Sequence, residues 1–195
     1  MVSPYIWTRG LEKYAYSSNK KIKVLSYSTL IPRDHLYIVF RTWSKWAPGR
    51  WVLFVHCNPT SEPYGRDDPE TEASLEIAQS LGFGGLGILY LFSYRKENWD
   101  KRVRKRHIGP GSKLWLRDSL KLFSLRIAAW GDSGTARDRD FTVWYKLRPM
   151  LCLGKTEKGN PISSIDYTGG FDYIKLLPFY INPFKRGIEC DQIKK

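Results

Sequence analysis

The stretch RWVLFVHCNPTSEPYGRDDPET, residues 50–71, predicts a buried strand, a tight turn, a polar loop and the start of a helix. Trp51 to Cys57 is a short, almost wholly apolar run, which is typical of a strand covered on both faces in a parallel sheet. Asn58-Pro59 ends this strand, because proline has no N–H to donate to a neighbouring strand. Asp68 followed by proline and acidic residues is a favourable helix start. Ligands bind beyond the carboxyl ends of strands in open α/β sheets, so this turn is where chemistry is expected.

The rest of the chain continues the alternation of strand and helix. Period-2 patterns at 21–30 and 36–43 predict an antiparallel hairpin at one edge of the sheet. The predicted fold class is α/β: a three-layer αβα sandwich with a central, mainly parallel sheet and an N-terminal antiparallel addition. We expect one domain over 1–195, made of an N-terminal addition (1–49), a core (50–161) and a C-terminal extension (162–195). Further strands are predicted at 86–92, 125–130 and 150–153, and helices at 70–81, 112–123 and 137–147.

The chain is strongly basic, with 32 Lys and Arg against 19 Asp and Glu, and 15% of its residues are aromatic. Basic surface interleaved with aromatic rings suits a nucleic acid, because phosphates bind the charges and bases stack on the rings. A membrane surface is disfavoured, since the sequence contains no basic amphipathic helix and no long apolar span. The three cysteines lack metal-ligand spacing, and the N-terminus lacks the apolar core of a signal peptide, so we expect a cytoplasmic protein without a metal site.

Asn58 is the first candidate site residue. Its amide can hold a water or a base edge, but a turn-forming Asn that bonds its own backbone is an equal alternative. Asp68 is expected to cap the helix, which leaves Asp67 as a base for water or as a stabiliser of cationic charge on a sugar. His56 lies on an apolar strand, where a hydrogen-bonded core histidine is more common than a catalyst.

The segment Arg95 to His107, RKENWDKRVRKRH, is the densest basic stretch of the chain. It follows the carboxyl end of the second predicted strand, at the same edge as Asn58, and is therefore predicted to contact phosphates. His107 is interpreted as part of this solvated loop. Gly82 to Gly85 precedes a strand, so a helix stop explains it better than a phosphate cradle, and nucleotide hydrolysis is disfavoured.

Six short motifs occur in order between Arg50 and Pro161: RWVLFVHCNPTS, DDPET, LGFGGLGILYLFSYR, IGP, AAWG and LGKTEKGNP. They resemble a widespread bacterial domain family of unassigned function, whose pattern is LNPSTAD, DDPT, GFGG, NLFAYR, GP, AAWG and LGLTKDGHPRHPLY. That family in turn resembles the uracil-DNA glycosylase superfamily. The superfamily places an Asn-Pro or Asp-Pro motif after the first strand of a four-stranded parallel αβα sandwich, with a late His-Pro loop on the same edge.

The resemblance assigns roles to particular residues. In the mismatch-specific branch, the Asn at the position of Asn58 holds the water that attacks the sugar C1′. The later motif stabilises the departing base and presses on the DNA. Here that motif is Pro161 to Asp166, PISSID, so the histidine is missing and Ser163 or Ser164 is left to donate hydrogen bonds. Tyr90-Leu91-Phe92 replaces the family's NLF, which suggests an aromatic pocket for an unusual base.

The leading hypothesis is a monofunctional DNA glycosylase that flips a modified base out of double-stranded DNA and leaves an abasic site. Antiphage glycosylases, which act on hypermodified bases such as glucosylated cytosines in phage DNA, are the nearest functional parallel. The enzyme is expected to be a monomer that needs no cofactor. A non-catalytic nucleic-acid-binding module and a hydrolase of free modified nucleosides are the alternatives. The predicted residues are Asn58 and Asp67 for catalysis; His56, Pro59, Tyr64, Tyr90, Phe92, Ser163 and Ser164 for the base pocket; and Arg95, Lys96, Lys101, Arg102, Arg104, Lys105, Arg106, Lys155 and Lys158 for DNA binding.

Overall fold

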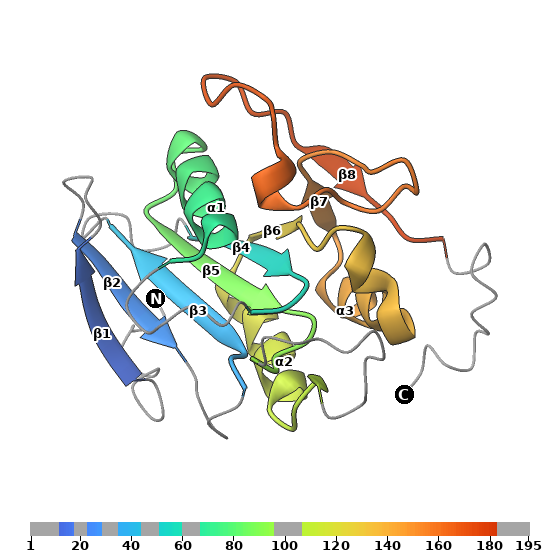
Figure 1. The fold of residues 1–195 in the computed structure, drawn as a ribbon, viewed down its shortest axis with the longest axis horizontal. Helices are drawn as coiled ribbons and strands as arrows, with labels where there is room; N and C mark the ends of the chain where they lie inside the picture. The colour runs from blue at the N-terminus through green and yellow to red at the C-terminus, as the bar shows by residue number, and fades with distance from the viewer. Residues whose placement is uncertain are drawn as a thin grey trace.

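In the computed structural model, the described residues are 12–17, 23–28, 35–43, 51–59, 67–95 and 107–182. Their strands form one eight-stranded sheet in the order β1-β2-β3-β5-β4-β6-β7-β8 (Figure 1). The strands are β1 (Glu12–Ser17), β2 (Lys23–Ser28), β3 (Ile38–Thr42), β4 (Trp51–His56), β5 (Gly85–Tyr90), β6 (Leu125–Ala128), β7 (Met150–Cys152) and β8 (Leu177–Phe179).

The sheet is mixed. The four central strands β5, β4, β6 and β7 pair in parallel, as the apolar runs predict. The outer pairings β1–β2, β2–β3, β3–β5 and β7–β8 are all antiparallel. The expectation of a mainly parallel sheet is therefore not confirmed for the whole sheet and describes only its centre. The predicted N-terminal hairpin is confirmed, because β2 pairs with β3 from Leu25 opposite Thr42 to Ser28 opposite Val39.

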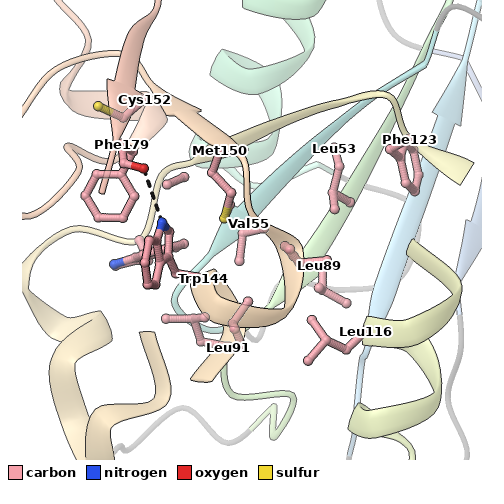
Figure 2. Packing of buried hydrophobic residues seen from close by; sticks show 14 of the residues in the cluster. Leu53, Val55, Leu89, Leu91, Leu116, Phe123, Trp144, Met150, Cys152 and Phe179 are labelled. Atoms are coloured by element: carbon pink, nitrogen blue, oxygen red, sulfur yellow. Dashed lines mark hydrogen bonds between the residues drawn. The ribbon is translucent and has the colours of Figure 1, made fainter. Parts of the chain in front are cut away.

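Helices cover both faces of the sheet (Figure 1). On β4, Val52 and Phe54 pack with Ile77 of α1, whereas Leu53 and Val55 face the opposite cluster with α2 and α3. Figure 2 shows that second cluster, in which the Trp144 indole of α3 donates a hydrogen bond to the Phe179 carbonyl of β8 at 3.2 Å. Each fully buried apolar side chain of this kind contributes roughly 1.5–3 kcal/mol. The helices are α1 (Pro69–Ser80), α2 (Ser112–Leu122) and α3 (Arg139–Leu147).

The helix ends follow local sequence signals. Asp68 caps α1 as predicted, because its side chain accepts a hydrogen bond from the Thr71 N–H at 2.8 Å. Gly82 follows the end of α1 with φ +77, a conformation that glycine adopts without strain. The α3 helix begins two residues later than predicted, since Arg137 and Asp138 take left-handed φ angles of 57 and 52. A 3₁₀ segment, Asp132–Asp138, precedes it.

The topology defines where a ligand would bind. The chain leaves β4 toward α1 on one face of the sheet, and it leaves the neighbouring strand β6 toward α3 on the other face. In open α/β sheets, a ligand-binding crevice is expected where loops diverge in this way, at the carboxyl ends of the two strands. Asn58 follows β4 and Gly131 follows β6, so these two turns flank the expected crevice. No helix within the described ranges is long and apolar enough to cross a membrane.

Candidate functional site

Asn58 is the first residue beyond the extended hydrogen bonding of β4. The Leu91 and Phe92 N–H groups donate to the carbonyls of His56 and Cys57, both at 2.9 Å, which continues the pairing to that point. The Asn58 side chain is half-buried, and its Nδ2 lies 3.4 Å from the Pro59 carbonyl. This is a long contact to the residue's own turn, so it is a weak tether. Pro59 beside it is buried.

His56 is buried against α1, with 1% of its surface exposed. Its Nε2 lies 2.9 Å from the Ser74 hydroxyl, and Ser74 donates to the Ser164 hydroxyl at 2.7 Å. The Ser164 oxygen is itself 3.5 Å from His56 Nε2. The interpretation of His56 as a hydrogen-bonded core residue is therefore confirmed, and the bond reaches a loop 108 residues away.

Glu70, in the first turn of α1, completes this group. Its Oε2 lies 3.6 Å from His56 Nδ1, and its Oε1 accepts a hydrogen bond from the Ser163 hydroxyl at 2.7 Å. The order carboxylate, imidazole, hydroxyl resembles that of nucleophilic triads, but Ser74 and Ser164 are only 0% and 2% exposed and cannot meet a substrate. Glu70 and Ser163 are partly exposed. We refer to His56, Glu70, Ser74, Ser163 and Ser164 as the polar network, and it opens to the surface at Glu70 and Ser163.

Hydrogen bonds of the backbone and of the polar network position the loop Pro161 to Asp166, which lacks the histidine of the family pattern. The Pro161 carbonyl accepts from Gly131 N–H at 3.0 Å, and the Ile162 N–H donates to the Gly154 carbonyl at 3.1 Å. These bonds hold the loop against the turns that follow β6 and β7, and the chain then reaches α1. Ser163 and Ser164 are thus brought to the same edge as His56, as the base-pocket prediction requires. The partners Ser74 and Glu70 were missed, because acidic and small polar residues in a helix's first turns are also ordinary helix formers and caps.

Asp67 does not match the expectation of a free catalytic carboxylate. Its Oδ1 accepts from Arg41 Nε at 2.9 Å and from Arg41 Nη2 at 2.5 Å. The side chains of Arg41 and Asp67 are 11% and 6% exposed, respectively, so the pair is well shielded from water. The carboxylate is compensated by a buried guanidinium, which argues against Asp67 as the base for water.

The predicted aromatic residues lie in different cores. Tyr90 is 4% exposed under α1, and its ring packs edge-on against His56 at 6.1 Å between centroids. Burial, and then the charge of Asp68, raise the pKa of Tyr90 far above its ordinary value, so the phenol stays neutral. Phe92 is fully buried in the opposite cluster, with α2 and α3. Phe92, one of three candidates for stacking on a flipped base, thus has no exposed face in this structure, and Tyr64 lies outside the described residues.

The loop after β7 is bound to the turn after β6 through Asp132. This carboxylate accepts hydrogen bonds from Thr156 at 2.7 Å and Asn160 at 2.8 Å, and Lys158 Nζ lies 3.2 Å away. Asn160 first, then Thr156 and Lys158, hold the pKa of Asp132 below its usual range. The AAWG and LGKTEKGNP motifs are thus joined by one side chain. Lys158 is partly neutralised there, while Lys155 is exposed.

The two ends of the basic segment are held together at the carboxyl end of β5. The Tyr94 ring stacks on His107 at 5.3 Å, and the Tyr94 N–H donates to the His107 carbonyl at 3.2 Å. His107 is 6% exposed, so the expectation of a solvated histidine is wrong. Arg95 is partly buried at this closure. Lys96, Lys101, Arg102, Arg104, Lys105 and Arg106 lie outside the described residues.

Cys57, the neighbour of Asn58, is expected to react slowly with electrophiles. Burial raises the pKa of its thiol to about 12 from 9.0, and the charges of Glu70 and Asp140 add to the shift. Because the thiolate is the reactive form, the shift lowers the reactive fraction at pH 8 by roughly 10³-fold. Iodoacetamide labelling, resolved for each cysteine peptide by mass spectrometry, is expected to modify Cys57 only after urea is added. Equal labelling rates with and without urea would contradict this.

Comparison with known proteins identifies the family. Residues 37–162 match the family described as "Protein of unknown function (DUF1643)", and the chain belongs to that family. The matched part begins just before β3 and ends one residue before Ser163. The antiparallel strand β3 is thus part of the family domain. No curated protein and no solved structure matches the chain. Among the residues that the structure describes, no three His, Cys, Asp or Glu side chains gather as a metal ion would require.

Proposed function

We propose that the protein is a DNA glycosylase of uracil-DNA glycosylase-like fold, which hydrolyses the N-glycosidic bond of a modified base, in defence against phage DNA. One observation carries the proposal: the Asn58-Pro59 turn follows the first of four parallel strands, and the Ser163-Ser164 loop reaches the same edge. These are the two features that the resemblance to uracil-DNA glycosylases implies. The formal net charge of +13 suits a polyanionic substrate.

The reaction would begin with a base flipped out of the duplex into the crevice between β4 and β6. The bond from C1′ to the base nitrogen breaks, and the base leaves with the electron pair while cationic charge develops on the sugar. The DNA phosphates stabilise that charge. A water held by the Asn58 amide adds to C1′ and loses a proton, which leaves an abasic site.

The test is direct incubation with DNA. Duplexes carrying glucosylated 5-hydroxymethylcytosine, 5-hydroxymethylcytosine, uracil or unmodified cytosine are treated with the protein and then with alkali, which cleaves abasic sites. Strand breaks on a modified duplex and none on the unmodified one support the proposal. Breaks on none of these duplexes contradict it. Free modified nucleosides in the same assay separate a nucleoside hydrolase from a DNA glycosylase.

A non-catalytic nucleic-acid-binding module is the second candidate, and two contacts favour it. The Asn58 amide points to its own turn, at 3.4 Å from the Pro59 carbonyl, and the Asp67 carboxylate is paired with Arg41. Both polar groups thus have structural partners. Binding to these duplexes without any alkali-sensitive site would make this candidate the better one.

The basic segment is expected to dominate DNA affinity. Replacing Lys101, Arg102, Arg104 and Lys105 with alanine should weaken binding, because fewer phosphates are neutralised and fewer counterions are released. The slope of log K against log salt should become shallower by about 0.9 for each phosphate that the variant no longer neutralises. Fluorescence anisotropy of a labelled duplex, titrated from low to high salt, measures both quantities.

The matched control for this experiment is replacement of Lys121 and Lys146 with alanine. These lysines lie in the last turns of α2 and α3. A helix that connects two parallel strands runs back along them, so its last turn lies at the amino ends of the strands, away from the crevice. Equal losses of affinity per charge in the two sets would show that only net charge matters.

A further inference from the structure

We infer that Glu70 is the general base of this site and takes the proton from the attacking water, an inference that rests on the glycosylase proposed above. The polar network reaches the surface at Glu70 and Ser163, and Glu70 is its only carboxylate. The Glu70 side chain is 22% exposed, against 6% for Asp67. A general base that deprotonates water must be accessible to water. Glu70 meets this requirement better than Asp67.

A hydrogen bond from Ser163 orients the Glu70 carboxylate. The Ser163 hydroxyl donates to Oε1 at 2.7 Å, and His56 Nδ1 lies 3.6 Å from Oε2. A general base acts efficiently when its acceptor atom is fixed before the reaction. The Asp67 carboxylate is also fixed, but by a guanidinium that compensates its charge. Glu70 has a histidine and a hydroxyl as neighbours instead.

The network also provides a place for the proton. Ser74 donates its own proton to Ser164, so its oxygen accepts from His56 Nε2, which therefore carries a hydrogen. The lone pair of Nδ1 then faces Glu70 Oε2. A proton taken up by the Glu70 carboxylate would be shared with this nitrogen once the two atoms close from 3.6 Å to hydrogen-bond distance, which would stabilise the protonated carboxyl group. His56 thus acts as a positioning residue that does not meet the substrate.

Glu70 lies close to the turn that carries Asn58. Its Oε2 lies 3.6 Å from Nδ1 of His56, which is two residues before Asn58 in the chain. Asn58 would orient the water by a hydrogen bond, and Glu70 would accept one of its protons while the water oxygen bonds to C1′. The bond between C1′ and the base breaks, and the base takes the electron pair. Charge and atoms balance without a cofactor.

The experiment compares Glu70→Gln with Glu72→Gln in single-turnover excision on the modified duplex that the parent protein cleaves. Both variants remove one negative charge from the first turn of α1, but Glu72 is exposed and outside the polar network. Glu70→Gln is expected to lower the rate by about 10²-fold, the lower end for loss of a general base. Glu72→Gln should keep the parental rate.

A second variant distinguishes loss of the general base from misfolding. Thermal unfolding is measured for each protein, and Glu70→Ala is assayed with sodium formate, a small carboxylate that can replace the lost base. Recovery of the rate with formate supports Glu70 as the base, since a purely structural role would not respond. If Glu70→Gln keeps the parental rate while Asn58→Ala loses it, or if formate restores nothing, the inference is wrong and the glycosylase stands. If the parent makes no abasic sites on any duplex, the glycosylase itself is wrong.

Discussion

Replacing Asn58 with alanine is expected to lower the rate of base excision by about 10²-fold or more, with DNA affinity and thermal unfolding nearly unchanged. Asn58 lies at the carboxyl end of β4, and its amide has only a long 3.4 Å contact to Pro59. Little stability therefore depends on it. The loss is one of positioning, because even a small displacement of a reacting group costs around 10²-fold in rate.

Single-turnover kinetics on a modified duplex measure this effect, and anisotropy measures affinity in the same buffer. Asn58→Asp is the graded comparison, because a carboxylate keeps an oxygen that can accept a hydrogen bond from water. It should retain more activity than Asn58→Ala. If Asn58→Ala excises the base as fast as the parent, the Asn-Pro turn has only a structural role. The binding-module function would then be the better proposal.

The centre of the fold follows from local patterns in the sequence. The apolar run before Asn58 predicts a strand buried on both faces, and β4 has residues of both cores. Asp68-Pro69 predicts the start of α1, where the cap is found. Such signals act within a few residues, so a single sequence reveals them. They give the order of β4, α1, β5, α2, β6, α3 and β7 along the chain.

Two antiparallel pairings of the sheet, β3–β5 and β7–β8, do not follow from local patterns. The strand β8 has three residues, Leu177–Phe179, and one of them is a proline. It is defined by its antiparallel pairing with β7, in which Phe179 lies opposite Met150. A proline is tolerated there because an edge strand leaves some N–H groups unpaired. The pairings β3–β5 and β7–β8 join segments far apart in the chain, and composition does not reveal them.

The sequence predicted where the polar groups gather better than it predicted which residues they contact. The carboxyl end of β4 and the late serine loop do meet, through Ser74 of α1, whose hydroxyl lies 2.9 Å from His56 Nε2 and donates to Ser164 at 2.7 Å. The motif DDPET contains three acidic residues; the sequence identifies Asp68 as the helix cap, but it does not show which of Asp67 and Glu70 is paired with a cation. The structure assigns the cap to Asp68, a salt bridge to Asp67, and the partly exposed position to Glu70. The decisive partner of Asp67 is Arg41, 26 residues away.

Replacing Arg41 with methionine is expected to lower the free energy of unfolding by about 3–5 kcal/mol. The change leaves the Asp67 carboxylate, 6% exposed, without its guanidinium. An unpaired buried charge is costly because water can no longer solvate it. The pair also connects β3 to the residue before the α1 cap, so both elements should be affected. Urea unfolding followed by tryptophan fluorescence measures the loss.

The double variant Arg41→Met with Asp67→Asn tests the cause. It removes both charges together, so it should be considerably more stable than the sum of the two single losses predicts. If the losses in the free energy of unfolding are additive, Arg41 and Asp67 are not energetically coupled. The same proteins test the mechanism: with Asp67 as a structural partner of Arg41, the double variant should excise bases at close to the parental rate under conditions where it is folded. If the double variant is folded but its excision rate is reduced by about 10²-fold, Asp67 and not Glu70 is the general base.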